Sequence, residues 1–204
     1  MTQVTHGIRS ILSHPFFYSG FQSLMGAHAS RTRFTSNYVK PVKGMRILDV
    51  GCGPADIFAY LPETIYFGFD ISQDYINRAR LHFGSKAEFS CKHLTLEDIQ
   101  KLPPFDVVLA LGLLHHLNDD EATDIMRLAR SALKPGGRLL TIDPCWDVSQ
   151  SLAAKILIKN DRGQNVRDRA GYENLTKSVF NVTQSNVVHT KWIPYTHCVM
   201  QCSL

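Results

Sequence analysis

From Arg46 onward, short apolar runs alternate with longer segments whose apolar residues recur at helical spacing. This alternation is typical of a parallel sheet flanked by helices. The expected strands are residues 45–50, 66–69, 87–94, 105–111 and 138–142, followed by two that would pair as a hairpin, 186–192 and 195–202. The pattern predicts an α/β fold: a single doubly wound, Rossmann-like domain with a mostly parallel seven-stranded sheet and a C-terminal antiparallel hairpin.

Capping residues predict where the flanking helices begin and end. Ser72 is a good N-cap, and Gly84 is a good C-terminal stop, for the helix between them. Pro54 suits the first turn of a helix that would follow the first strand. Asn118 or Asp119 would cap an amphipathic helix before the fifth strand.

The length of 204 residues fits one domain with a sizeable core. We expect residues 1–44 to form a helical cap segment and residues 45–204 to form the α/β domain, with a helical insertion at about 145–185. The formal net charge of +4 is too small to indicate a nucleic-acid partner. The five cysteines form no CxxC pair, so we expect neither a bound metal nor a disulfide framework.

Two features bear on the compartment. The longest apolar run, residues 107–114, is too short to cross a bilayer. Polar residues and Pro15 interrupt the N-terminal region where a signal peptide would need an apolar core. We therefore expect no membrane span and a cytoplasmic protein, and the sequence does not predict its oligomeric state.

A glycine-rich turn follows the first strand, and an acidic residue ends the second. Glycines let the backbone approach a ligand, and a carboxylate can accept both hydroxyls of a ribose. Asp49, Gly51, Gly53 and Asp70 have this spacing, which suits several adenosine ligands. Asp56 stands where a dinucleotide site has its third glycine, and it would repel a phosphate. S-adenosylmethionine has no phosphate and carries an amine and a sulfonium, so the acidic turn favours it over NAD.

Four segments in this order and spacing resemble the class I S-adenosylmethionine-dependent methyltransferases. They are ILDVGCGP (47–54), FGFDIS (67–72), FDVVLALGLLHHL (105–117) and LKPGGRLL (133–140). The resemblance covers residues 45–145, about half of the chain. One departure is Ala55, which stands where many members have the last glycine of a GxGxG motif. We expect this alanine to narrow the turn slightly without abolishing binding.

The resemblance implies donor-binding roles for the residues at matching positions. These are Asp49, Gly51, Cys52 and Gly53 around the methionine part, Asp70 at the ribose, Ile71, His93 and Leu94 at the adenine, and Leu111 and Gly112 near the amino group.

Two histidines follow the fourth strand, at the sheet edge where ligands bind in such folds. His115 or His116 could take a proton from an acceptor, because an unperturbed imidazole titrates near neutral pH. Alternatively, one or both support the loop or contact the donor. The sulfonium is already activated, so methyl transfer can also proceed by alignment alone.

The acceptor site is the least defined part of the sequence. Arg162 and Arg167 flank Gly163 and could hold a carboxylate or phosphate of an acceptor, although a solvated loop between helices is the more ordinary explanation of them. Tyr172, with Tyr195 and His197, could line the same pocket or belong to the core. Tyr18 lies in the N-terminal segment and could close over the donor.

The leading hypothesis is methyl transfer from S-adenosylmethionine to an oxygen or nitrogen of a small-molecule acceptor, and the two arginines would suit an anionic one. No NPPY-like tetrapeptide follows the fourth strand and no long basic stripe occurs, so an RNA or protein methyltransferase is less favoured. A non-catalytic regulator that binds S-adenosylmethionine is the main alternative. A nucleotide-dependent oxidoreductase is a third, and it would bind NAD.

Overall fold

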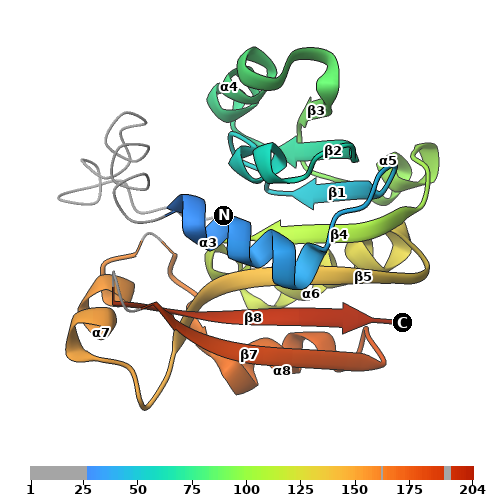
Figure 1. The fold of residues 1–204 in the computed structure, drawn as a ribbon. Helices are drawn as coiled ribbons and strands as arrows, with labels where there is room; N and C mark the ends of the chain where they lie inside the picture. The colour runs from blue at the N-terminus through green and yellow to red at the C-terminus, as the bar shows by residue number, and fades with distance from the viewer. Residues whose placement is uncertain (1–26, 162, 191–193) are drawn as a thin grey trace.

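A computed structural model describes residues 27–161, 163–190 and 194–204 (Figure 1). Within these residues, one sheet has the strand order β3-β2-β1-β4-β5-β8-β7. The parallel strands are β1 (Arg46–Val50), β2 (Ile65–Asp70), β3 (Glu88–Cys91), β4 (Phe105–Leu111) and β5 (Leu133–Trp146). The last two strands, β7 (Val182–Thr190) and β8 (Tyr195–Ser203), form an antiparallel hairpin, and β8 pairs antiparallel with β5.

The direction in which the sheet grows reverses between β1 and β4. The chain starts in the middle of the sheet at β1, adds β2 and β3 on one side, and then returns to add β4 and β5 on the other. Ligands in doubly wound sheets bind at this reversal, beyond the carboxyl ends of the strands. The predicted fold class is confirmed, with one short extra strand, β6 (Arg167–Asp168), that pairs with the end of β5.

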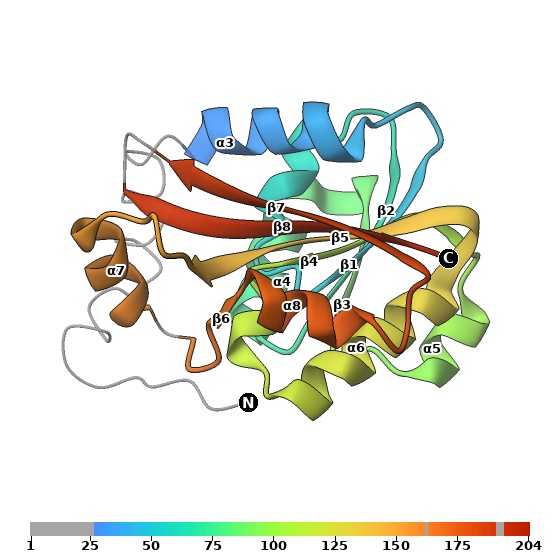
Figure 2. The ribbon, with the colours of Figure 1, turned by 90° about the horizontal axis from the view of Figure 1, so that it is seen from below.

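Helices cover both faces of the sheet. Figure 2 shows α3 (Ala27–Phe34) on one face and α5 (Leu96–Lys101), α6 (Asp119–Ala132) and α8 (Arg169–Thr176) on the other. On the α3 face, α4 (Gln73–Phe83) buries Ile76 and Ala79 in the same core cluster as Phe34. No helix in the described part of the chain is long and apolar enough to span a bilayer.

One helix lies beyond the carboxyl ends of the parallel strands. After β5, the chain forms α7 (Leu152–Lys159), which Figure 1 shows at the end of the sheet where the parallel strands finish. The insertion expected at 145–185 is therefore two short helices, α7 and α8, with β6 between them. Within it, α7 packs against β5 and β8, and α8 packs against α6 and β7.

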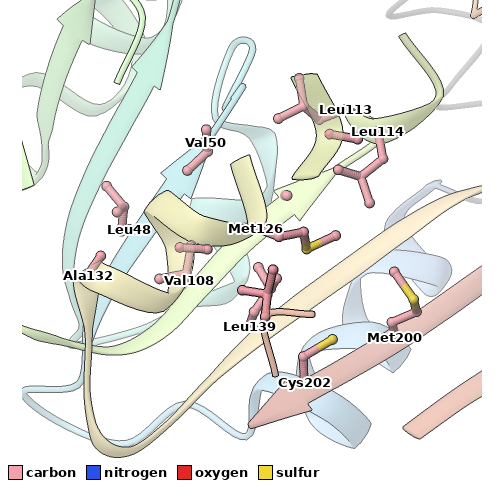
Figure 3. Packing of buried hydrophobic residues seen from close by; sticks show 14 of the residues in the cluster. Leu48, Val50, Val108, Leu113, Leu114, Met126, Ala132, Leu139, Met200 and Cys202 are labelled. Atoms are coloured by element: carbon pink, nitrogen blue, oxygen red, sulfur yellow. The ribbon is translucent and has the colours of Figure 1, made fainter. Parts of the chain in front are cut away.

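The central strands are buried on both faces, which is why β4 reads as a nearly continuous apolar run. Val108 of β4 and Leu139 of β5 are fully buried and pack in one cluster with Met126 of α6 (Figure 3). The cluster continues to Met200 and Cys202 of β8, so it joins the parallel part of the sheet to the C-terminal hairpin.

Several boundaries differ from the sequence prediction. A short 3₁₀ turn, η2 (Asp56–Tyr60), replaces the α-helix expected after Pro54, because Ala55 adopts a left-handed conformation (φ 57°) and Pro62 follows closely. The helix α5 was not predicted, although Thr95 and Asp98 form a capping box at its start. The strand expected at 138–142 extends over Leu133–Trp146, since its ends also pair with neighbouring strands.

The buried contact between α6 and the sheet yields a stability prediction. Met126→Ala should lower the free energy of unfolding by about 2 to 5 kcal/mol, because it leaves a cavity in a closely packed core. Chemical denaturation of the purified protein measures this difference. The neighbouring Arg127 has a 63% exposed side chain, so Arg127→Ala should change the free energy by less than about 0.5 kcal/mol. Equal losses in the two variants would contradict the assigned packing.

Candidate active site

The turn after β1 folds back over the end of β2. The backbone amides of Gly51 and Cys52 both donate to the carbonyl of Phe69, at 2.8 and 3.0 Å. Gly51 has a φ of 72°, and a Cβ there would lie 2.9 Å from a methyl carbon of Leu113, so this position requires glycine. The neighbouring Gly53 also has a positive φ, 54°, and open space where a Cβ would stand. The turn therefore exposes backbone to a ligand, as the glycine motif predicts.

Asp70, at the end of β2, is fixed by this turn. Its Oδ2 accepts a hydrogen bond from the amide of Gly53 at 2.8 Å, and its Oδ1 accepts one from the amide of Ser72 at 2.7 Å. Each carboxylate oxygen can accept a further hydrogen bond. The geometry thus suits a pair of adjacent hydroxyls such as those of a ribose.

Asp49, at the end of β1, is a buried carboxylate with an unused oxygen. It is 2% exposed, and its Oδ2 accepts a hydrogen bond from the hydroxyl of Tyr66 at 2.5 Å. Its Oδ1 makes no hydrogen bond with any described residue. Burial raises the pKa of Asp49 to about 7, against the lowering effect of the Tyr66 hydrogen bond and with a smaller contribution from Asp70. A cationic group placed here would satisfy Oδ1 and favour the ionised form.

The alanine at the last glycine position of the motif has its side chain in the core. Ala55 is fully buried and belongs to the core cluster that contains Ile57 and Leu61. Its methyl group therefore packs into the core, and the effect of the substitution is on the backbone. A left-handed conformation costs an alanine about 1 kcal/mol relative to glycine.

The other residues expected to bind the methyl donor lie partly at the carboxyl ends of the strands and partly in the core. Ile71 is 47% exposed next to Asp70, so a flat ring could pack on it. His93 is exposed in the loop after β3, whereas Leu94 is buried in the core and its side chain does not reach the site. Leu111 is half-buried at the end of β4. Gly112 has a φ of 67° and uses its amide on the carbonyl of Ile142 at 2.7 Å, which leaves its carbonyl available.

His115 is held between two carboxylates. Its Nδ1 lies 2.8 Å from Oδ1 of Asp143, which also accepts from the His115 amide at 3.2 Å. Its Nε2 lies 3.3 Å from Oδ1 of Asp161. Burial alone would lower the pKa of His115, but the hydrogen bonds and charges of the two carboxylates raise it to about 9. His116 is half-buried, with its ring centroid 4.0 Å from that of His115.

Arg167 supports the loop that carries His115. Its guanidinium donates to the carbonyls of Leu114, Leu117 and Asn165 and makes two hydrogen bonds to Asp119. These contacts use the donors that an anionic acceptor would need. The structure therefore gives Arg167 a supporting role in place of the expected contact with an acceptor.

Of the remaining expected acceptor residues, the structure describes Tyr172 and places it in the core. Tyr172 is 1% exposed and donates its hydroxyl to the carbonyl of Pro144 at 2.8 Å, so it is a core residue. Tyr18 and Arg162 lie outside the described residues. A cavity of about 260 Å³ does lie beside the loop after α7, lined by Trp146, Ile158, Lys159, Gly163, Gln164 and Val166.

Sequence reasoning did not select Asp143 and Asp161. Asp143 is an acid near the end of a strand, the same signal that identified Asp49 and Asp70, so a stricter use of that pattern would have found it. Asp161 is 46 residues from His115 in the chain, and no local pattern connects the two.

Comparison with known proteins agrees with this architecture. A family model described as a methyltransferase domain matches residues 48–139. The ubiquinone biosynthesis O-methyltransferase of Idiomarina loihiensis is 33% identical over 125 residues, 58% of this chain and 50% of that protein. The O-methyltransferase cnsE of Penicillium expansum is 32% identical over 160 residues, 70% of this chain and 57% of that protein. The chain thus spans about half the length of the curated relatives it matches.

Among solved structures, the pyocyanin biosynthetic protein PhzM superimposes with a TM-score of 0.71 at 16% identity, over 98% of this chain and 62% of that one. At this identity the likeness concerns the fold alone. Fold, glycine turn and family match together define a methyltransferase of the Rossmann type. The match over residues 48–139 is to a methyltransferase domain, and these comparisons support a class I S-adenosylmethionine-dependent methyltransferase with S-adenosylmethionine as its methyl donor.

The buried carboxylate of Asp49 predicts how donor affinity depends on pH. The donor's ammonium favours the ionised carboxylate, so protonation of Asp49 in the free protein competes with binding. Affinity for S-adenosylmethionine should fall by up to about tenfold per pH unit as pH decreases from 7 to 5, where the donor's amine stays charged. Isothermal titration calorimetry measures it. Asp49→Asn should bind weakly and without this slope, and a flat wild-type profile would contradict the assignment.

Proposed function

We propose that the chain transfers the methyl group of S-adenosylmethionine to a hydroxyl oxygen of a small-molecule acceptor. One observation carries the proposal. His115 with Asp143 and Asp161, here called the His115 cluster, lies after β4 at the same end of the sheet as the acidic glycine turn of β1 and β2. The strands β1 and β4 are direct neighbours. Neighbouring strands are about 4.8 Å apart. A donor in the turn and an acceptor beside His115 would therefore be close enough to react.

The proposed binding of the methyl donor rests on two carboxylates and on the exposed backbone of the glycine turn. Asp70 would bind the ribose hydroxyls, and the buried Oδ1 of Asp49 would bind the ammonium. Gly51 and Gly53 would let the backbone approach the methionine part. When bound, the donor supplies a methyl group on a positively charged sulfur that is already activated as a leaving group. The protein then has to align the acceptor oxygen with that methyl group and exclude water.

The acceptor half rests on the need to remove a proton. A hydroxyl oxygen that gains a methyl group must lose its hydrogen. Of the two histidines after β4, we assign this proton to His115, because Asp143 fixes the orientation of its ring. Asp143 orients the ring through Nδ1 at 2.8 Å, so we assign the proton exchange to Nε2, whose contact with Asp161 is longer, at 3.3 Å. Both relatives compared above are named as O-methyltransferases, which supports oxygen over nitrogen as the acceptor atom.

A turnover assay tests the function. The protein is incubated with S-adenosylmethionine and a panel of hydroxylated small molecules that includes phenols and aliphatic alcohols, and S-adenosylhomocysteine is measured by mass spectrometry. We expect turnover with at least one hydroxylated acceptor and none with its methyl ether. Tight donor binding without turnover across the panel would favour a regulator that binds S-adenosylmethionine.

The proton-transfer role predicts a pH profile. Because the pKa of His115 is about 9, about 1% of the imidazole is neutral at pH 7. With a hydroxyl acceptor, kcat/KM should rise about tenfold per pH unit from pH 7 and level off near pH 9. His115→Gln should lower kcat/KM by about 10²-fold or more and remove this rise. The exposed His82 offers a control, since His82→Gln should leave the profile unchanged. A wild-type profile that is flat over this range would exclude His115 as the base.

A further inference from the structure

The second nitrogen of His115 is bound by a residue from outside the sheet. Asp161 follows α7, in the insertion, and its Oδ1 lies 3.3 Å from Nε2 of His115. The bond to Asp143 on the other nitrogen is shorter, 2.8 Å, and the side chain of Asp143 is 1% exposed. Asp161 has a 25% exposed side chain. Nε2 therefore has the longer contact, to the carboxylate that is nearer to solvent.

Asp161 is itself fixed by two further donors. The hydroxyl of Tyr195 in β8 donates to its Oδ2 at 2.5 Å, and the amide of Gly163 donates to its Oδ1 at 2.9 Å. Although burial alone would raise it, the hydrogen bond and charge of His115 hold the pKa of the Asp161 carboxyl well below its usual range. The carboxylate is therefore ionised and oriented at neutral pH.

The loop after Asp161 fits closely against His115. A Cβ at Gly163 would lie 2.0 Å from Cδ2 of the imidazole and 2.7 Å from the His115 carbonyl, so only glycine allows this approach. The amide of Asn165 donates to the same carbonyl at 2.9 Å. Three contacts thus join the loop to His115: one through the Asp161 side chain and two through the backbone at residues 163 and 165. These three contacts fix the position of the loop relative to the imidazole of His115.

We propose that Asp161, oriented by Tyr195, is a positioning residue for methyl transfer: it holds the imidazole of His115 by Nε2 and determines when that nitrogen gives up its proton. This rests on the proposed function, in which His115 receives the acceptor's proton. Before each transfer Nε2 must lose its proton to solvent, and the acceptor hydroxyl must take the place of Asp161 beside Nε2. The hydroxyl then gives its proton to Nε2 as its oxygen forms a bond to the methyl carbon, while the carbon–sulfur bond of the donor breaks and S-adenosylhomocysteine leaves. Asp161 is the partner that stabilises the proton on Nε2 between turnovers.

The other titratable groups around His115 act differently. Asp143 from β5 binds Nδ1 and stays in place during this exchange. His197 of β8 is nearby, but burial lowers its pKa to about 4, so it carries no charge in the working range. His116 stacks beside the ring, and Tyr195 contacts the opposite oxygen of Asp161. Among these groups, Asp161 supplies the negative charge on the Nε2 side.

An NMR titration of the His115 imidazole tests the proposal without any acceptor. The resonance is assigned by its loss in His115→Gln, and its midpoint should lie near 9 in the wild-type protein. Asp161→Asn removes a negative charge beside Nε2, so the midpoint should fall by about one unit or more. Tyr195→Phe leaves that charge in place, so the midpoint should stay or rise slightly. Asp147→Asn, in the loop before α7, is a matched carboxylate control and should not move it.

Two outcomes would overturn the proposal: an unchanged midpoint in Asp161→Asn, or equal falls in Asp161→Asn and Tyr195→Phe, which would indicate loop disruption. If Asp161→Asn does not fold, Gly163→Ala provides a second variant. It keeps the carboxylate but pushes the loop away from His115, and the midpoint should fall likewise.

Kinetics with an accepted hydroxyl compound extend the test. In Asp161→Asn, kcat/KM should level off at a lower pH than in the wild-type protein, and this shift should equal the fall in the NMR midpoint. We also expect kcat to fall by a larger factor than KM changes. A shifted NMR midpoint without any turnover would contradict the proposed function while leaving the effect of Asp161 on His115 intact. Turnover with an unshifted midpoint would contradict the effect of Asp161 on His115 while leaving the proposed function intact.

Discussion

The parallel pairing of β1 with both β2 and β4 is the constraint on which the site depends. In parallel strands all carboxyl ends meet at one edge, so residues that follow different strands become neighbours. Asp49, Asp70 and His115 each follow or end one of these three strands. The same pairing buries β1 and β4 on both faces, which gives the edge a rigid base. Loops can then carry polar groups there without having to hold the fold together.

The site is also where the fold carries its least favourable electrostatics. Asp49 is buried with an oxygen that no described residue satisfies, and burial of this kind costs about 1 to 3 kcal/mol when a partner is absent. The same burial raises the pKa of Asp49 to about 7. The His115 cluster resolves a similar problem differently, by placing a buried cation between two anions. Asp49 thus keeps one oxygen without a partner among the described residues, whereas both ring nitrogens of His115 have one.

Local signals in the sequence predicted the fold and the glycine turn after β1. Gly51, Asp70 and the caps Ser72 and Asn118 act within a few residues of their own position, so spacing along the chain was enough. Signals failed where distant segments decide the outcome. Arg167 was expected to face an acceptor, yet its donors are used on the loop 114–119, about 50 residues earlier in the chain. The sequence around an arginine does not predict which distant loop its guanidinium will hydrogen-bond to.

The cavity beside the loop after α7 and the contacts of His115 share one segment of the chain. Gly163 lines the 260 Å³ cavity and also contacts His115, and Asp161 is two residues away. An acceptor group that enters this cavity would press on the loop that orients Asp161. A substitution that reshapes the cavity would therefore alter the protonation of His115 as well as the fit of the acceptor. Acceptor preference and pH dependence should change together, whereas donor binding, which depends on β1 and β2, should stay independent of both.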